Sequence, residues 1–258
     1  MNHRLARRTA PVFALAAAAV LFGFPVGVRA QPGRGPAPTP KAGAPIDITG
    51  YWVALVTEDW RYRMMTPAKG DYPNVPLNPA GRRLADAWDP AKDEAAGEQC
   101  KGYGAGNVMR NPERIHITWE NDTTLKVETD NGNQTRLFYF GDAPQGGEPT
   151  YQGISMAQWE FAGGRAPRGG GPPRGGDLKI VTTHLKAGYI QRNGVPYSAG
   201  AVITEHYDLL KEPDGESYLL VTTLIEDPQY LNRPFQRSTH FKKQADASGW
   251  DPAPCSAR

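Results

Sequence analysis

The feature that most constrains this chain is a series of short segments in which apolar and polar residues alternate. In residues 114–120 (RIHITWE), Ile115, Ile117 and Trp119 fall on one side of an extended chain and polar residues fall on the other. Alternation with a period of two predicts a β-strand with one buried face. Residues 124–129 and 135–140 continue the pattern around an Asn-Gly turn, which predicts a hairpin.

The same reasoning extends over most of the chain. Further strands are expected at residues 48–56, 154–161, 178–185, 201–210, 218–225 and 236–243. One helix is expected over residues 79–88, because Asn78 is a good N-cap and Pro79 suits the first helical position. About eight strands, one short helix and no alternation of strands with helices predict a mainly β fold. We expect an antiparallel up-and-down barrel or a strongly curved sheet.

The beginning of the chain predicts export. Arg4, Arg7 and Arg8 precede an apolar run over residues 12–26, and Val28-Arg29-Ala30 suits a signal peptidase, so residues 1–30 are predicted to be a signal peptide cleaved after Ala30. The apolar run is shorter than the roughly 20 residues that span a bilayer, so no transmembrane anchor is expected after cleavage. The expected location is periplasmic or secreted, in a bacterium.

Composition divides the remainder into three parts, one of which contains a loop insertion. Residues 31–45 are rich in Pro and Gly and predict a disordered leader, residues 46–245 form the predicted barrel domain, and residues 246–258 form a C-terminal tail. Residues 163–176 contain Arg165, Arg168 and Arg174 among Gly and Pro, and predict a flexible loop between two strands.

The net charge of the mature chain does not favour nucleic-acid binding. Removing residues 1–30 takes away four of the 29 basic residues and none of the 27 acidic ones, which leaves a formal charge of −2. No nucleic-acid partner is therefore expected. The oligomeric state is left open.

Two cysteines remain after cleavage, Cys100 and Cys255. An oxidising compartment allows them to form a disulfide bond, which would join the tail to the middle of the chain. Their spacing does not show whether they meet, and two lone cysteines do not form a zinc motif.

Several motifs resemble known families. Gly50-Tyr51-Trp52 resembles the Gly-x-Trp of lipocalin first strands, in which the Trp closes the bottom of the barrel. Most of the mature chain resembles an uncharacterised secreted bacterial protein family. The shared features are Gly-x-Trp, Leu77-Asn78-Pro79-Ala80-Gly81-Arg82, Cys100, Arg114 before a strand, and Glu226-Asp227-Pro228. The resemblance implies a lipocalin-like (calycin-type) barrel and no particular activity. Where that family often has His and Asp, this chain has Tyr197 and Ala199.

The first candidates for chemistry are two carboxylates in apolar strands. Glu205 follows Ile203 on one face of its strand, and Glu226 shares a face with Leu220 and Leu224. A carboxylate in such surroundings must be paired, hydrogen-bonded or protonated, and a shifted pKa would suit general acid–base catalysis. The alternative is a structural ion pair with Arg63, Arg233 or Arg237.

Histidines supply the other candidates. His116, His206 and His240 fall on polar faces of their strands, whereas His184 shares a face with Leu178 and Ile180. We therefore expect no metal site, and we group His184 and Tyr207 with the two glutamates as candidate acid–base residues.

Aromatic residues are the candidate ligand-binding side chains, since small-molecule pockets are mostly apolar. The candidates are Trp52, Trp60, Tyr62, Arg63, Trp119, Tyr139 and Trp159. Residues 58–63 (EDWRYR) interleave charges and rings where a barrel mouth is expected, which suits either a ligand rim or a salt-bridged corner.

These observations support three hypotheses of function. The leading one is an exported barrel that binds a small apolar or aromatic molecule in its interior. The alternatives are a cofactor-free lyase, isomerase or hydrolase that uses Glu, His and Tyr, and an envelope structural or interaction protein. No nucleotide-binding loop, nucleophile elbow or Cys-x-x-Cys motif is present, so no cofactor is expected.

Overall fold

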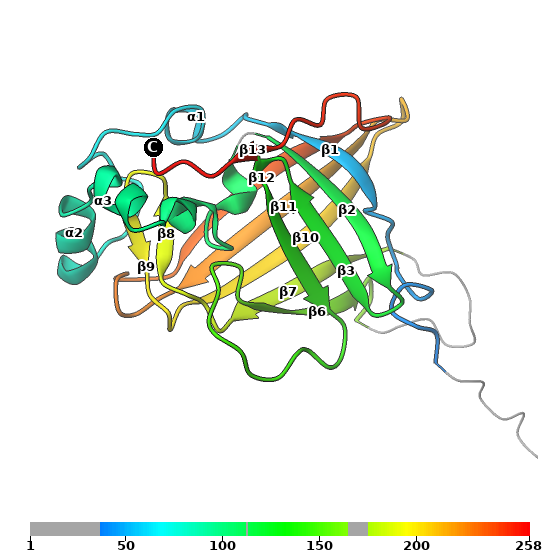
Figure 1. Cartoon of the computed structure of the whole chain (residues 1–258). Helices are drawn as coiled ribbons and strands as arrows, with labels where there is room; N and C mark the ends of the chain where they lie inside the picture. Colours follow the sequence, from blue (N-terminus) through cyan, green and yellow to red (C-terminus); the bar gives the residue numbers. More distant parts are fainter. Residues whose placement is uncertain (1–36, 112, 165–174) are drawn as a thin grey trace, which may run out of the picture. The chain divides into compact units, whose positions relative to one another are not determined.

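The computed structural model describes residues 37–111, 113–164 and 175–258, and within them nine strands close a β-barrel (Figure 1). The strands are β1 (Gly50–Leu55), β2 (Arg114–Asn121), β3 (Thr124–Thr129), β5 (Gln134–Tyr139), β6 (Ile154–Phe161), β7 (Gly176–Thr183), β10 (Val202–Lys211), β11 (Ser217–Glu226) and β12 (Phe235–Lys243). Their order around the ring is β1-β12-β11-β10-β7-β6-β5-β3-β2. The predicted mainly β barrel is confirmed, with nine strands instead of about eight.

One pair of neighbours departs from the predicted up-and-down arrangement. Strands β5 and β6 are parallel, with Phe138 opposite Ser155 and Tyr139 opposite Met156, whereas the other eight neighbouring pairs of the nine-strand ring are antiparallel. A closed ring with an odd number of strands cannot alternate in direction throughout. Residues 140–153 make the return connection that a parallel pair requires.

The described helices gather at one end of the barrel, together with a short hairpin (Figure 1). They are α1 (Trp60–Arg63), α2 (Pro79–Asp86), α3 (Pro90–Ala95) and the 3₁₀ helices η1 (Gln99–Tyr103) and η2 (Val108–Arg110), and the hairpin is β8 (Gly188–Gln191) with β9 (Val195–Tyr197). We call this the capped end. Helix α2 starts as predicted, because Asn78 Oδ1 accepts hydrogen bonds from the backbone N–H groups of Ala80 and Gly81, each at 2.9 Å. No helix in the described part of the chain is both long and apolar enough to cross a bilayer.

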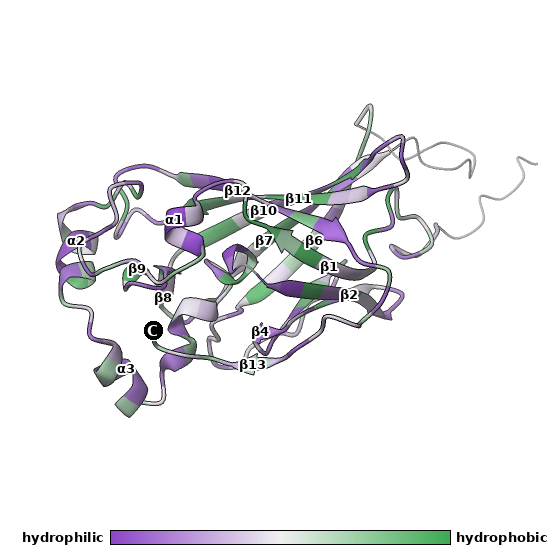
Figure 2. Cartoon of the chain, turned by 90° about the horizontal axis from the view of Figure 1, so that it is seen from above, coloured by the Kyte–Doolittle hydropathy of each residue, from purple (hydrophilic) through white to green (hydrophobic). Residues whose placement is uncertain are grey.

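Alternating side chains fill the barrel. Buried residues such as Ile117, Phe138, Tyr207 and Phe241 form one apolar cluster inside the barrel. A second cluster, including Tyr72, Ile190 and Tyr197, lies beneath the cap. In Figure 2 the barrel strands accordingly carry both hydrophobic residues (green) and hydrophilic residues (purple). The middle of the barrel is therefore a packed core.

The opposite end carries the N-terminal segment, and we call it the leader end (Figure 1). The Trp159 indole N–H donates to the Pro40 carbonyl at 2.8 Å, the Lys41 N–H donates to the Asp122 carbonyl at 3.2 Å, and Ala44 and Ile46 pack against the barrel core. The prediction that residues 31–45 are disordered is therefore wrong for residues 38–45. Residues 31–36, the predicted signal peptide and residues 165–174 of the predicted loop lie outside the described residues.

The C-terminal tail is fixed at the capped end. Strand β13 (Ala253–Pro254) pairs with β4 (Asn131–Gly132), and Cys100 and Cys255 are joined by a disulfide bond. This bond connects η1 to the last residues of the chain.

Candidate functional site

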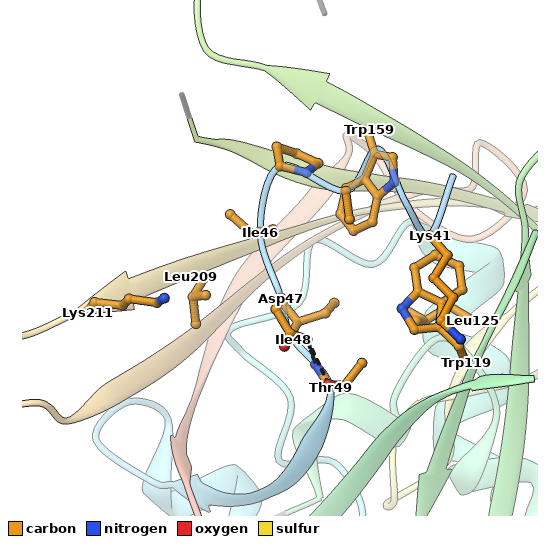
Figure 3. A pocket seen from close by; sticks show the side chains of 12 residues that line it. Lys41, Ile46, Asp47, Ile48, Thr49, Trp119, Leu125, Trp159, Leu209 and Lys211 are labelled. Carbon is orange, nitrogen blue, oxygen red and sulfur yellow. Dashed lines mark hydrogen bonds between the residues drawn. The ribbon is translucent and has the colours of Figure 1, made fainter. Parts of the chain in front are cut away.

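A cleft of about 590 Å³ opens between the N-terminal segment and the barrel at the leader end. Figure 3 shows residues 46–49 crossing between Leu209 and Lys211 on one side and the two tryptophans Trp119 and Trp159 on the other. The lining consists of Lys41, Ala44, Pro45, Ile46, Asp47, Ile48, Thr49, Trp119, Leu125, Trp159, Leu209 and Lys211. The lining is mostly apolar, with charges at three positions.

Strand alternation places the aromatic wall of the cleft. Trp119 follows Ile115 and Ile117 on the inner face of β2, and Trp159 lies on the inner face of β6. The Trp119 and Trp159 rings are 6.4 Å apart between centroids, and Phe140 lies 5.2 Å from Trp159 and 5.6 Å from Trp119. Three rings at these separations form a continuous aromatic surface.

The charged groups of the cleft are Lys41, Lys211 and Asp47. The Asp47 carboxylate accepts hydrogen bonds from the Thr49 N–H at 3.0 Å and the Thr49 hydroxyl at 2.7 Å. Partial burial by itself would raise the pKa of Asp47, but the bonds from Thr49 and the charges of Lys243 and Lys211 lower it below its ordinary value. Asp47 thus stays ionised and fixes the turn that leads into β1.

Trp52 forms part of the closed floor rather than the cleft wall. Its ring is fully buried, its indole N–H donates to the Ile48 carbonyl at 2.9 Å, and Lys243 Nζ lies 4.5 Å from the ring centroid. Ile48 lines the cleft above it. Trp52 therefore acts on the cleft by holding Ile48 in place.

Deeper in the barrel lies a buried ion pair, Arg136 with Glu205. The Arg136 guanidinium donates to both Glu205 oxygens, at 3.0 and 2.5 Å, and also donates to Thr182 Oγ1 at 3.4 Å. The Tyr207 hydroxyl donates to Glu205 at 3.5 Å, and burial raises the Tyr207 pKa well above its ordinary value, with a further contribution from Glu205. Both members of the pair are fully enclosed.

This arrangement matches the structural alternative for Glu205, but with a partner that the sequence analysis missed. Arg136 was not among the expected arginines, although it alternates with Phe138 and Phe140 on one face of its strand. Its place on the same face as two phenylalanines is the sequence feature that predicts a buried arginine. A bidentate pair of this kind occupies the carboxylate on both oxygens.

The four candidate acid–base residues do not converge. Glu226 is exposed at the end of β11, on the face opposite to Val221 and Ile225, whereas Glu205 points inward. His184 is exposed beyond the end of β7 with φ of 55°, and its Nε2 lies 2.9 Å from the Gly147 carbonyl. The expectation that Glu226 and His184 share buried faces is therefore wrong, and only Tyr207 accompanies Glu205.

The candidate ligand-binding residues are divided between both ends. Trp119 and Trp159 line the cleft, but Trp60 is 68% exposed on α1 at the capped end and Tyr62 follows it there. Tyr139 alternates with the inward-pointing Phe138 and so lies on the outer face of β5. Phe140 packs against both cleft tryptophans from behind but does not itself line the cleft.

Residues 58–63 form a salt-bridged corner at the capped end. Arg63 is buried, pairs with Glu58, and donates from Nε to the Arg110 carbonyl at 2.9 Å. Arg110 pairs with Asp59 at 3.1 Å. The salt-bridged alternative for this segment is therefore present in the structure.

One group among the described residues has metal-ligating side chains close together. Glu160, Asp177 and His206 lie on neighbouring strands, and one ligand atom from each falls within 4.8 Å of the others. His206 Nδ1 is 3.5 Å from Asp177 and 3.6 Å from Glu160, and Lys179 Nζ is 3.7 Å from Glu160. Surface groups of acidic side chains like this one are common without a metal ion, so the group carries no metal-site assignment.

Comparison with known proteins adds no assignment to this geometry. No family model, no curated protein and no solved structure matches the chain.

Proposed function

We propose that this protein is an exported barrel that binds a small apolar or aromatic molecule in the leader-end cleft. The observation that carries the proposal is the cleft of about 590 Å³ with Trp119 and Trp159 in its wall. Small-molecule sites are typically concave, mostly apolar and roughly 300–1,000 Å³ in volume. The cleft meets these three criteria.

The geometry changes where the ligand is expected to bind. Because Ile117, Phe138, Tyr207 and Phe241 fill the centre of the barrel, the ligand would lie at the leader end and not in the interior. One face would stack on the tryptophans while Ile46, Ile48 and Leu209 cover the other. Lys41 and Lys211 would remain at the rim for a polar group of the ligand.

Export is part of the proposal and depends mainly on the sequence of residues 1–30. The disulfide bond between Cys100 and Cys255 supports it, because structural disulfides persist in oxidising compartments and are rare in the cytosol. The lipocalin-like relationship also remains a proposal, supported by the buried Trp52 beneath the cleft.

The geometry favours binding over acid–base catalysis. Glu205 is held on both oxygens by Arg136 inside a packed core, and Glu226 and His184 lie elsewhere on the surface. A general base must come within hydrogen-bond reach of its substrate. No such approach to Glu205 is open.

The test is to purify the mature protein from the periplasm and analyse it by native mass spectrometry, with extraction of the co-purifying molecules. We expect a small apolar or aromatic molecule bound to the wild type, with its occupancy strongly reduced in Trp119→Ala. Trp60→Ala is the matched control, since it removes an exposed indole at the other end. Equal occupancy in both variants, or an empty wild type that also fails to bind hydrophobic dyes, would overturn the proposal.

A further inference from the structure

Three arginines at the capped end lie close together, away from the cleft. Arg63 comes from α1, Arg110 from η2 and Arg237 from β12. Arg63 donates to the Arg110 carbonyl, and Arg237 donates to the carbonyls of Ile190 and Gly106. Arg63 and Arg237 thus both bind the backbone of residues 106–110, the segment that carries Arg110.

The positive charges are deeply buried. The side chains of Arg63 and Arg110 are 1% and 4% exposed, and Arg237 is also buried. Burial lowers the pKa of Arg110 to about 10, and burial together with the charges of Arg110 and Arg63 lowers that of Arg237. The shifts indicate that the cluster lacks enough negative charge to compensate for its desolvation.

The negative charges that do reach the cluster lie at its solvent edge. Glu58 pairs with Arg63 and Asp59 pairs with Arg110, and these carboxylate side chains are 30% and 38% exposed. Among the buried arginines of the described chain, Arg237 alone has no carboxylate partner. The arginine side chains are therefore held in the interior, whereas the two carboxylates can turn outward into the solvent.

Unsatisfied donors indicate which group would complete the cluster. Arg63 Nη2, Arg110 Nη1 and Arg237 Nε are buried and have no hydrogen-bond acceptor among the described residues. A buried donor without an acceptor is unfavourable, because it has lost its hydrogen bonds to water. Guanidinium groups bind phosphate oxygens particularly well, because the donors are planar and permanently charged.

We propose that Arg63, Arg110 and Arg237 form a binding site for a phosphate group, which the Glu58–Asp59 turn occupies in this structure. A phosphate dianion would replace the two carboxylate charges and supply oxygens for the remaining donors. The site is independent of the proposed ligand cleft, which lies at the opposite end of the barrel.

The turn that holds the two carboxylates, residues 57–59, is suited to moving while Arg63 stays anchored. Asp59 has φ of 50°, which is uncommon for a residue other than glycine, and the following helix α1 has only four residues. Thr57 and Asp59 are exposed and Trp60 is 68% exposed, so little apolar burial holds the turn against the barrel. Its displacement would uncover the arginines.

The experiment titrates the mature protein with inorganic phosphate by isothermal calorimetry, with sodium chloride matched for ionic strength. Glu58→Gln/Asp59→Asn removes the internal competitor and should bind phosphate at least tenfold more tightly than the wild type. Arg110→Gln should abolish binding. Glu212→Gln/Asp214→Asn, which makes the same charge change at an exposed turn between β10 and β11, should bind like the wild type.

A second measurement needs no variant and so does not depend on whether one folds. In hydrogen–deuterium exchange on the wild type, saturating phosphate should increase exchange in residues 57–60 and leave residues 212–216 unchanged. Unchanged exchange in residues 57–60 would overturn the proposal. Equal phosphate affinity in the two double variants, or binding that persists in Arg110→Gln, would do the same.

Discussion

The two ends of the barrel are covered by different kinds of structural element. At the leader end a single extended segment crosses the strands, leaves a cleft of about 590 Å³ and meets aromatic side chains. At the capped end, helices, a hairpin and a disulfide-linked tail cover the strands, and the inner side chains include buried arginines. The comparison teaches that the capped end is covered by packed and cross-linked elements, whereas the leader end leaves a cleft about twice the volume of the 290 Å³ pocket beneath the cap.

The barrel interior reflects the same division. Near the capped end the inward-facing positions are polar, and Glu205, Thr223 and Arg237 lie opposite one another on three neighbouring strands. Towards the leader end they become Leu209, Trp119 and Trp159. The inside of the barrel is therefore apolar towards the leader end, whereas towards the capped end it depends on directional polar contacts.

The strongest test of the rigid end is to break its buried ion pair. Arg136→Met would leave the Glu205 carboxylate buried without a cation, and we expect the free energy of unfolding to fall by about 3–5 kcal/mol. Urea denaturation measures this loss. Arg136→Met/Glu205→Leu should recover most of it, because no uncompensated charge remains. A double variant as unstable as the single one would contradict this account of the pair.

The second largest effect is expected from the disulfide bond. It closes a loop with a sequence separation of 155 residues, so Cys100→Ser/Cys255→Ser should lower the free energy of unfolding by about 2–5 kcal/mol. Thermal unfolding of the oxidised wild type, the reduced wild type and the variant would show this. If the tail adds nothing to the cap, the three melting temperatures will coincide.

A smaller effect is expected at the start of α2. Asn78→Ala removes the acceptor for the N–H groups of Ala80 and Gly81 and should cost about 1 kcal/mol. Asn78→Asp keeps an acceptor and serves as the control in chemical denaturation. A loss of stability equal in both variants would show that the cap itself is unimportant.

The smallest effect concerns the leader end and pH. The pKa of Asp47 is lower in the folded protein than in the unfolded chain, so its stabilisation is present above the unfolded pKa and is lost as pH falls through the folded value. Since Asp47 is exposed, the contribution should stay below about 1 kcal/mol. Unfolding measured between pH 7 and pH 3 should show a slightly weaker pH dependence in Asp47→Asn. An identical pH dependence in the variant and the wild type would show that Asp47 does not contribute to the change of stability with pH.

The sequence predicted the parts of this fold that depend on local alternation. Residues 114–120 and 124–129 form strands as expected, and Asn78 caps a helix, because the determinants of these features lie within a few residues. The parallel pairing of β5 with β6 depends on how the ring closes, which no local pattern records. Docking of residues 38–45 was missed because a Pro- and Gly-rich segment has no periodicity from which to predict it.

The candidate site was predictable to a similar degree. The inward direction of Trp119 followed from the clean alternation of its strand. Glu226 was misplaced because β11 is apolar on both faces, with Leu220 and Leu224 outside and Val221 and Ile225 inside. His184 was misplaced because its left-handed backbone ends the alternation of β7.

The central claim is that the leader end binds the ligand, and hydrogen–deuterium exchange with an aromatic probe tests it most directly. The probe is 8-anilinonaphthalene-1-sulfonate at saturating concentration. The account predicts slower exchange in residues 41–49 and at the ends of β2 and β6 around Trp119 and Trp159, with no change in α1, α2 or α3. Protection confined to the capped end, or no protection at either end, would contradict it.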